Sequence, residues 1–236
     1  MTETAADPGR RIVAIDGPAG VGKSTAARLL AERLRLPMLD TGAMYRAVAL
    51  AVLEKGVDPG DREAVVALAA AAPVEVVARG GEVEIRLAGR RVEPRIRTPE
   101  VSEASSKIST YPEVRRRLVE LQRQAGRRYG AVVEGRDIGT VVFPDTPYKF
   151  FLAAQTEVRA RRRHRELTAA AGKAPSLDQV RKDIERRDAR DSGRADSPLT
   201  CDESYQVIDT SDLSAPEVVE RMVRWIEERS ASGSGR

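Results

Sequence analysis

Short apolar runs alternate with amphipathic stretches along most of this chain. Residues 11–15 form an apolar run that ends at a Gly-rich turn, which is typical of a buried parallel strand leading into a helix. Similar short runs predict further strands at 37–39, 131–133, 148–152 and 206–209. The pattern therefore predicts five strands distributed over the length of the chain.

Apolar residues spaced by three and four positions predict helices between these strands. They cover residues 23–35, 43–53 and 215–228, and a further helix carries Val114 and Leu118. Strands that alternate with helices favour an α/β fold, in which a doubly wound parallel sheet has helices on both faces.

The segment 74–93 has a different pattern. Polar and apolar residues alternate at 74–77, 82–87 and 91–93, and glycines occupy the intervening turns. This pattern predicts a small antiparallel meander inserted between elements of the parallel sheet. Residues 1–10 and 230–236 lack periodicity, and we expect them to be flexible tails.

Composition narrows the function. Among 236 residues there are 40 Lys and Arg, 36 Asp and Glu, one Cys and one His, which excludes a disulfide framework and a Cys- or His-cluster metal site. No run of 18 apolar residues occurs, and the first 11 residues lack an apolar leader segment, so we expect a cytoplasmic protein without a membrane partner. The net charge of +4 suits a nucleic acid or a phosphorylated small molecule, and the composition permits a monomer.

One motif points to nucleotide binding. The sequence GPAGVGKS matches the phosphate-binding pattern G-x-x-x-x-G-K-[ST] directly after a predicted strand and at a helix start. Backbone amides and the helix N-terminus would surround the phosphates, Lys23 would reach the β and γ phosphates, and Ser24 would ligate Mg²⁺. The expected contacts are Gly17, Pro18, Ala19, Gly20, Val21, Gly22, Lys23, Ser24 and Thr25.

A second substrate would bind at the carboxyl ends of other strands. Asp40 and Thr41 follow the strand 37–39, where either could simply cap the next helix. Tyr45, one turn into that helix, could point at an acceptor.

Two further groups combine arginines with carboxylates. Arg136 and Asp137 follow the strand 131–133, either beside the phosphate loop or in a surface turn. Arg187, Asp191 and Arg194 are spaced by four and three residues, which predicts one shared helix face. Arginines on one face suit neighbouring phosphates, and ion pairs on a solvated helix are the alternative.

The densest basic run spans 159–165. It could form the root of a lid over the γ phosphate, a solvated face or a nucleic-acid patch. Aromatic residues are scarce there, which disfavours binding of single-stranded nucleic acid. A nucleotide-dependent switch or an NTPase stimulated by nucleic acid is the alternative function, and only this basic run and the net charge support it.

The assembled segments resemble the bacterial cytidylate kinases, a family of nucleoside monophosphate kinases. The matching segments are IDGPAGVGKST, LDTGAMYRA, EVSEASSKIS, YPEVRRRL, EGRDIGTVVFPDT and ERRDARDSGRADSPL. The resemblance implies ATP- and Mg²⁺-dependent phosphorylation of CMP and dCMP, with another acceptor such as UMP as the alternative. It also implies a core of 11–62 and 100–229, an inserted monophosphate-binding domain at 63–99 and a mobile lid near 162–188.

The resemblance further implies roles for single residues. Ser106, Arg115 and Asp137 would recognise cytosine, while Arg136, Arg187 and Arg194 would hold the acceptor phosphate and Asp191 the ribose. Thr41 and Tyr45 would line the acceptor site, and Arg159 and Arg162 would belong to the ATP-side lid. A clear Walker-B carboxylate is missing from the motifs, and Glu134 is at most an outer Mg²⁺ ligand.

Overall fold

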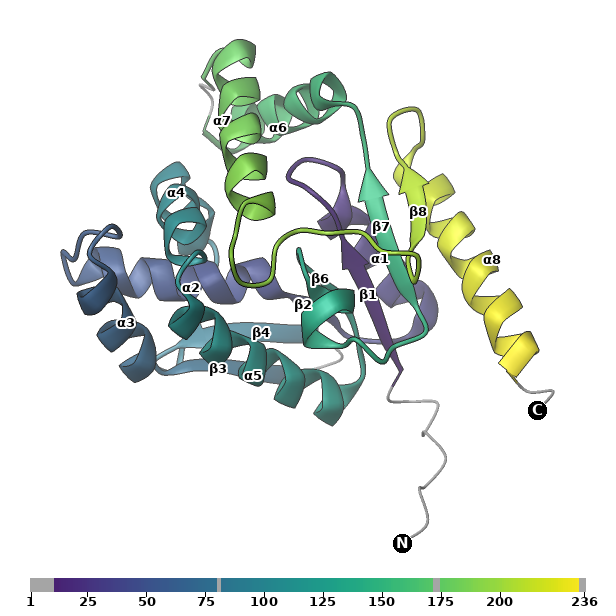
Figure 1. The fold of residues 1–236 in the computed structure, drawn as a ribbon, viewed down its shortest axis with the longest axis horizontal. Coiled ribbons are helices and arrows are strands. Elements are labelled where there is room, and N and C mark those ends of the chain that lie inside the picture. Colours follow the sequence, from purple (N-terminus) through teal and green to yellow (C-terminus); the bar gives the residue numbers. More distant parts are fainter. Residues whose placement is uncertain (1–10, 80–81, 172–174, 234–236) are drawn as a thin grey trace, which may run out of the picture. The chain divides into compact units, whose positions relative to one another are not determined.

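The computed structural model describes residues 11–79, 82–171 and 175–233. It divides the chain into two compact units, whose elements are labelled in Figure 1. The first unit holds the described residues up to Ile12 together with Leu36–Glu134, and the second holds Val13–Arg35 and the chain from Gly135 onward.

The second unit contains β7 (Lys149–Ala153), β8 (Gln206–Asp209) and, apart from Ile12, the strand β1 (Ile12–Asp16), and these three strands run parallel. β7 lies between the other two, with Ala14 opposite Lys149 and Phe151 opposite Val207. The helices are α1 (Lys23–Leu34), α6 (Thr156–Ala171), α7 (Leu177–Ser192) and α8 (Ala215–Gly233). α1 packs against α8, and α6 packs against α7 through a small apolar core.

The first unit pairs β2 (Met38–Asp40) with β6 (Ala131–Glu134) in parallel, so that Asp40 lies opposite Glu134 where both strands end. Its helices are α2 (Thr41–Glu54), α3 (Arg62–Ala71), α4 (Pro99–Ile108) and α5 (Pro112–Tyr129). The antiparallel strands are β3 (Val74–Arg79), β4 (Glu82–Leu87) and β5 (Arg90–Arg91). The apolar stripe of α5, which includes Val114 and Leu118, is buried, as its spacing predicts.

The five parallel strands belong to one helix-flanked sheet, and β3, β4 and β5 form the small antiparallel sheet. The predicted α/β class and the predicted meander are therefore confirmed. The sequence pattern missed α3 and α4. The antiparallel sheet falls in the same compact unit as α2, α4 and α5, so this unit extends well beyond the segment 63–99.

The ends of the chain differ in part from expectation. α8 continues to Gly233, so residues 230–233, expected in a flexible tail, are helical. The expected tail residues 1–10 and 234–236 lie outside the described residues. None of the described helices is long and apolar enough to cross a bilayer.

Candidate active site

The phosphate-loop motif joins β1 to α1 in the second unit. Gly17 has a φ of 145°, and a Cβ there would lie 2.3 Å from the carbonyl oxygen of Leu152 in β7. Gly22, with a φ of 92°, precedes the first residue of α1. The loop therefore needs glycine where its backbone approaches β7 and where it turns into the helix.

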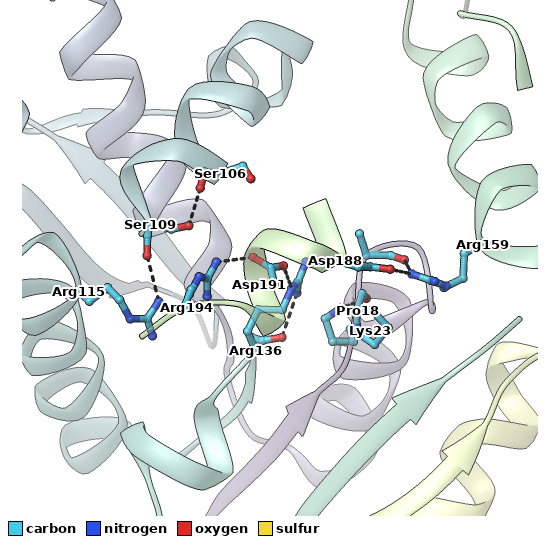
Figure 2. Close-up of polar contacts among 12 residues, drawn as sticks. Pro18, Lys23, Ser106, Ser109, Arg115, Arg136, Arg159, Asp188, Asp191 and Arg194 are labelled. Atoms are coloured by element: carbon cyan, nitrogen blue, oxygen red, sulfur yellow. Dashed lines mark hydrogen bonds and ion pairs between the residues drawn. The ribbon is translucent and has the colours of Figure 1, made fainter. Parts of the chain in front are cut away.

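The cation and the hydroxyl of the motif lie at the start of α1. Lys23 is buried and its Nζ donates a 2.6 Å hydrogen bond to the carbonyl of Pro18, so the side chain folds back over the loop (Figure 2). Ser24 is exposed on the first turn. Within the described part of the chain, no side chain caps this helix at Gly22. Such a helix start, with a lysine folded over it, is suited to binding phosphate.

Arg159 joins α6 to the phosphate loop. Its guanidinium donates to the carbonyl of Ala19 at 3.2 Å and to the Asp188 carboxylate at 2.5 Å. Asp188 lies on α7, and Figure 2 shows the two side chains facing one another. The root of the α6 and α7 pair is thus tied to the loop through a buried arginine.

Arg162 contacts the segment that follows β8. It donates to the hydroxyl and the carbonyl of Thr210 at 2.9 and 2.6 Å, and the Thr210 hydroxyl donates to the carbonyl of Val21 at 2.9 Å. Arg162 is therefore linked to the phosphate loop through Thr210. In the same run Arg163 pairs with Glu166, while Arg161 and Arg165 are exposed.

A buried carboxylate gathers the arginines near the end of α7. Asp191 is 1% exposed and accepts hydrogen bonds from Arg136, at 2.8 Å, and from Arg194. Burial raises the pKa of Asp191, but the charges of Arg136, Arg194 and Arg187 outweigh this effect and hold the pKa below its usual value. Figure 2 shows Asp191 between Arg136 and Arg194.

The expectation of one helix face for Arg187, Asp191 and Arg194 is wrong in one respect. α7 ends at Ser192, and the amide of Gly193 donates to the carbonyl of Ala189. Arg194 therefore lies beyond the helix and reaches Asp191 from the following turn. The i,i+3 contact survives because the chain stays close to the last turn of α7.

Asp40, the last residue of β2, and Thr41, the first residue of α2, are polar residues at the junction of these two elements. The Asp40 carboxylate caps α2, because it accepts from the amide of Ala43 at 2.9 Å, and it also binds Arg46. Burial raises the pKa of Asp40, but Arg46 and the helix amide outweigh it, and the net shift is downward. Thr41 is the first residue of α2, and its buried hydroxyl donates to the carbonyl of Glu134 at 2.7 Å. The capping alternative thus holds for Asp40.

Of the residues expected to recognise the base, Ser106 falls on α4 and Arg115 on α5, while Tyr45, expected to line the acceptor site, lies on α2. Arg115 is 2% exposed, with its guanidinium carbon 5.8 Å from the centre of the Tyr45 ring and one nitrogen 3.4 Å from the carbonyl of Ser109. The Ser109 hydroxyl in turn donates to the carbonyl of Ser106, and Figure 2 shows this chain of contacts. Tyr45, Ser106 and Arg115 are therefore brought together within the first unit.

The expected site residues form two groups. Those of the second unit are Gly17, Pro18, Ala19, Gly20, Val21, Gly22, Lys23, Ser24, Thr25, Arg136, Asp137, Arg159, Arg162, Arg187, Asp191 and Arg194. Those of the first unit are Thr41, Tyr45, Ser106 and Arg115. Each unit thus contains a cluster of buried polar side chains.

No role was predicted for Asp16, which is 0% exposed at the end of β1. Its carboxylate accepts from the amides of Ile138 and Gly139, each at 2.9 Å, and from the Tyr205 hydroxyl at 2.8 Å. Burial raises its pKa to about 6. Its position directly before the phosphate loop is the one sequence signal that could have found it.

Comparisons with known proteins identify the family. The family model for cytidylate kinase matches residues 13–228. The cytidylate kinase of Syntrophotalea carbinolica is 48% identical over 218 residues, which cover 92% of each chain. That of Corynebacterium glutamicum is 48% identical over 220 residues, or 93% of this chain and 95% of the relative.

A solved structure is similar in fold. An uncharacterized protein from Eubacterium ventriosum aligns with a TM-score of 0.52 at 15% identity, over 93% of this chain and 99% of that one. At this identity the likeness concerns the fold alone. The family match spans both compact units and every residue of the two groups above. The chain belongs to the cytidylate kinase family.

Proposed function

We propose that this protein transfers the γ-phosphoryl group of ATP to CMP or dCMP, releasing ADP and CDP or dCDP. The family match over 13–228 supports the reaction. The observation that carries the proposal is the Asp191 cluster, which presents Arg136 and Arg194 in the same compact unit as the phosphate loop. A donor-phosphate cradle and an acceptor-phosphate cluster are what a phosphotransferase requires.

The donor half of the site consists of the loop amides, the helix start and Lys23. The amides and the positive end of α1 bind the ATP phosphates, and Lys23 neutralises charge on the β and γ groups. Arg159 and Arg162 extend this half from α6, where their contacts with Ala19 and Thr210 keep them beside the loop.

The site fits Mg²⁺ brought by ATP. Among the residues that the structure describes, no group of three His, Cys, Asp or Glu could hold a metal by itself. The exposed Ser24 hydroxyl at the start of α1 is an oxygen ligand of the kind Mg²⁺ takes beside nucleotide phosphates. When bound, the ion neutralises charge on the transferring phosphoryl group.

The acceptor half combines phosphate, sugar and base recognition. Arg136, Arg187 and Arg194 bind the acceptor phosphate, and Asp191, which orders them, also binds the ribose. Asp137, Arg115 and Ser106 bind the cytosine, while Thr41 and Tyr45 line the site. Recognition by buried hydrogen-bonding groups rejects other bases, because their mismatched edges leave those groups unpaired.

The transfer needs no general base. The acceptor phosphate has a second pKa of about 6, so it is largely a dianion at neutral pH and can attack directly. The lone histidine, His164, lies on α6 within the basic run and takes no part in proton transfer. Catalysis consists of aligning the two phosphates and stabilising the spreading charge.

Water must be kept from the γ phosphate. We propose that the segment 162–188 acts as a lid and that 63–99 belongs to a monophosphate-binding domain, and that both close when the two nucleotides bind. Closure excludes water from the transferring phosphoryl group.

The test is ADP release in a coupled assay with ATP and Mg²⁺, using CMP, dCMP, UMP, AMP, GMP or no acceptor. We expect turnover with CMP and dCMP and little with the others. Activity confined to UMP would show that UMP, and not CMP, is the acceptor. ATP hydrolysis that is equal with and without an acceptor would contradict both closure of the lid and the kinase reaction. Stimulation by polynucleotide that disappears at high salt would favour the NTPase alternative.

A further inference from the structure

We propose that Asp16 is a positioning residue for the acceptor nucleotide, because it anchors the Arg136 and Asp137 pair to the end of β1. The role rests on the proposed function, in which these two residues bind the acceptor phosphate and the base. Asp16 itself touches neither nucleotide in this proposal. It acts through the backbone that carries Arg136 and Asp137.

The pair lies between two hydrogen-bonded positions. On one side, the amide of Gly135 donates to the carbonyl of Ile15 at 3.0 Å. On the other side, one carboxylate oxygen of Asp16 accepts from the amide of Ile138, and the second accepts from the amide of Gly139. Two consecutive residues of β1 therefore fix both flanks of the pair, across more than a hundred residues of sequence.

The three hydrogen bonds to Asp16 require a carboxylate at this position. Asp16 is fully buried, and its two oxygens accept three hydrogen bonds, from the amides of Ile138 and Gly139 and from the Tyr205 hydroxyl. An asparagine would offer one oxygen and one NH₂ group, so at least one of these donors would face another donor. A buried donor without an acceptor is costly.

Tyr205 reinforces the anchor and requires glycine at 139. A Cβ on Gly139 would lie 2.7 Å from the Tyr205 hydroxyl oxygen, so a larger residue would push the tyrosine off Asp16. The Tyr205 ring also makes an edge contact with Phe151 of β7, with ring centres 6.0 Å apart. The anchor thus connects β1, β7 and the segment before β8.

Loss of the Asp16 carboxylate should weaken binding of the acceptor nucleotide more than binding of ATP. The phosphate loop has contacts of its own, from Lys23 to Pro18, from Arg159 to Ala19 and from Thr210 to Val21. None of these three contacts passes through Asp16. The segment after β6 instead depends on Asp16 for two of its backbone amides.

The test compares Asp16→Asn with the wild-type full-length chain. We expect KM for CMP to rise about tenfold or more, because a shift of the backbone that carries Arg136 and Asp137 misplaces the groups that position the acceptor, while KM for ATP changes less than about threefold. Tyr205→Phe, which removes one of the three hydrogen bonds, should shift KM for CMP in the same direction by a smaller factor. The matched control is Asp61→Asn, which removes the exposed carboxylate that caps α3 and should leave both KM values unchanged.

A second readout does not need activity. Amide hydrogen exchange at Ile138 and Gly139 should be faster in Asp16→Asn, or at Gly139 in Tyr205→Phe if the first variant fails to fold. Wild-type exchange at both amides, or equal rises of KM for CMP and ATP, would overturn the proposal, as would lowered stability with both KM values unchanged. A wild-type protein that releases no ADP with CMP would refute the proposed function, and the exchange rates would still decide whether Asp16 is the anchor.

Discussion

Arg136 donates a 2.8 Å hydrogen bond from Nε to the carboxylate of Asp191, which lies 55 residues further along the chain. Arg194 binds the other oxygen of the same carboxylate. One buried acid therefore holds two arginines in place before any phosphate arrives. Preordered donors of this kind lose little conformational freedom when the ligand binds.

Asp191→Asn should weaken acceptor binding. With the carboxylate charge gone, the arginines lose their charged partner and repel one another, so we expect KM for CMP to rise by about tenfold to a hundredfold, as for a broken buried charged hydrogen bond. Initial rates at varied CMP and saturating ATP measure the effect. Asp61→Asn, at the exposed cap of α3, is the control, and an unchanged KM for CMP in Asp191→Asn would refute the role of the cluster.

Lys23→Ala should lower turnover by about 10²- to 10³-fold, the typical value of one preorganised donor at a developing charge. The reason is that Lys23 sits over the loop with its ammonium group beside the Pro18 carbonyl, where the proposed ATP phosphates would bind. The coupled assay at saturating substrates measures the loss. Lys55→Ala, at an exposed position after α2, should retain full activity, and near-normal turnover in Lys23→Ala would remove this lysine from the mechanism.

Asp137→Ala should reduce the preference for CMP over UMP by at least about tenfold. A carboxylate can accept from the amino group of cytosine, whereas uracil has a carbonyl at that position, so removal of the carboxylate erases the distinction. The ratio of kcat/KM for the two acceptors is the measurement. Asp145→Ala, an exposed acid in the same segment, is the matched control. An unchanged ratio would show that another residue reads the base.

Thr210→Val should raise KM for ATP more than KM for CMP. The hydroxyl of Thr210 donates to the Val21 carbonyl and accepts from Arg162, so valine leaves both groups without that partner. We expect KM for ATP to rise about fivefold, because the phosphate loop loses a contact that orders it before ATP binds, with a smaller change in KM for CMP. Thr210→Ser keeps the hydroxyl and should restore the wild-type value. If serine behaves as valine does, the effect comes from packing and the link to the loop is wrong.

The stability of the protein should carry a pH signature of Asp16. Burial raises the pKa of this carboxyl from 3.8 to about 6, with a smaller upward contribution from Asp137. Between about pH 4 and pH 6 the folded state therefore binds the proton more tightly than the unfolded state. The contribution of Asp16 to the free energy of unfolding accordingly falls as the pH rises through this window, by about 3 kcal/mol for a shift of this size.

Urea unfolding at several pH values tests this signature. Asp16→Asn lacks the titration, so the difference in the free energy of unfolding between wild type and variant should move against the wild type from pH 4 to pH 6 and then level off. Parallel pH curves for the two proteins would contradict the raised pKa.

Local patterns predicted the elements that such patterns encode. The apolar run of β1 with its Gly-rich turn fixed the phosphate loop and α1, and the alternation in 74–87 predicted β3 and β4. Helices such as α3 were missed because their alanine-rich sequence shows little contrast between faces. The π-helical turn at Ile138–Val142 also escaped prediction, since it depends on the Asp16 carboxylate accepting its first amides.

In the candidate site, too, features set by neighbouring residues could be predicted, and features set by residues distant in sequence could not. The position of Lys23 and Ser24 at the start of a helix was predictable, because the buried strand and the Gly-rich turn directly before them are local patterns. Asp16 was not, because its partners lie 122 to 189 residues away and a single aspartate at a strand end forms no pattern. Arg194 shows the intermediate case, in which the spacing predicted the contact with Asp191 but not the end of α7.

The start of α1 differs from that of most other described helices. α2, α3, α4 and α7 begin beside Asp40, Asp61, Thr98 and Ser176, each of which accepts a backbone amide. Glycine stands at that place in α1, and among the described residues no side chain takes over the role. In the proposed function, the phosphates of the nucleotide would supply the missing acceptor, so the substrate would also stabilise this helix. Because a ligand bound only by the native chain raises its stability, bound ATP would add to the free energy of unfolding of the protein.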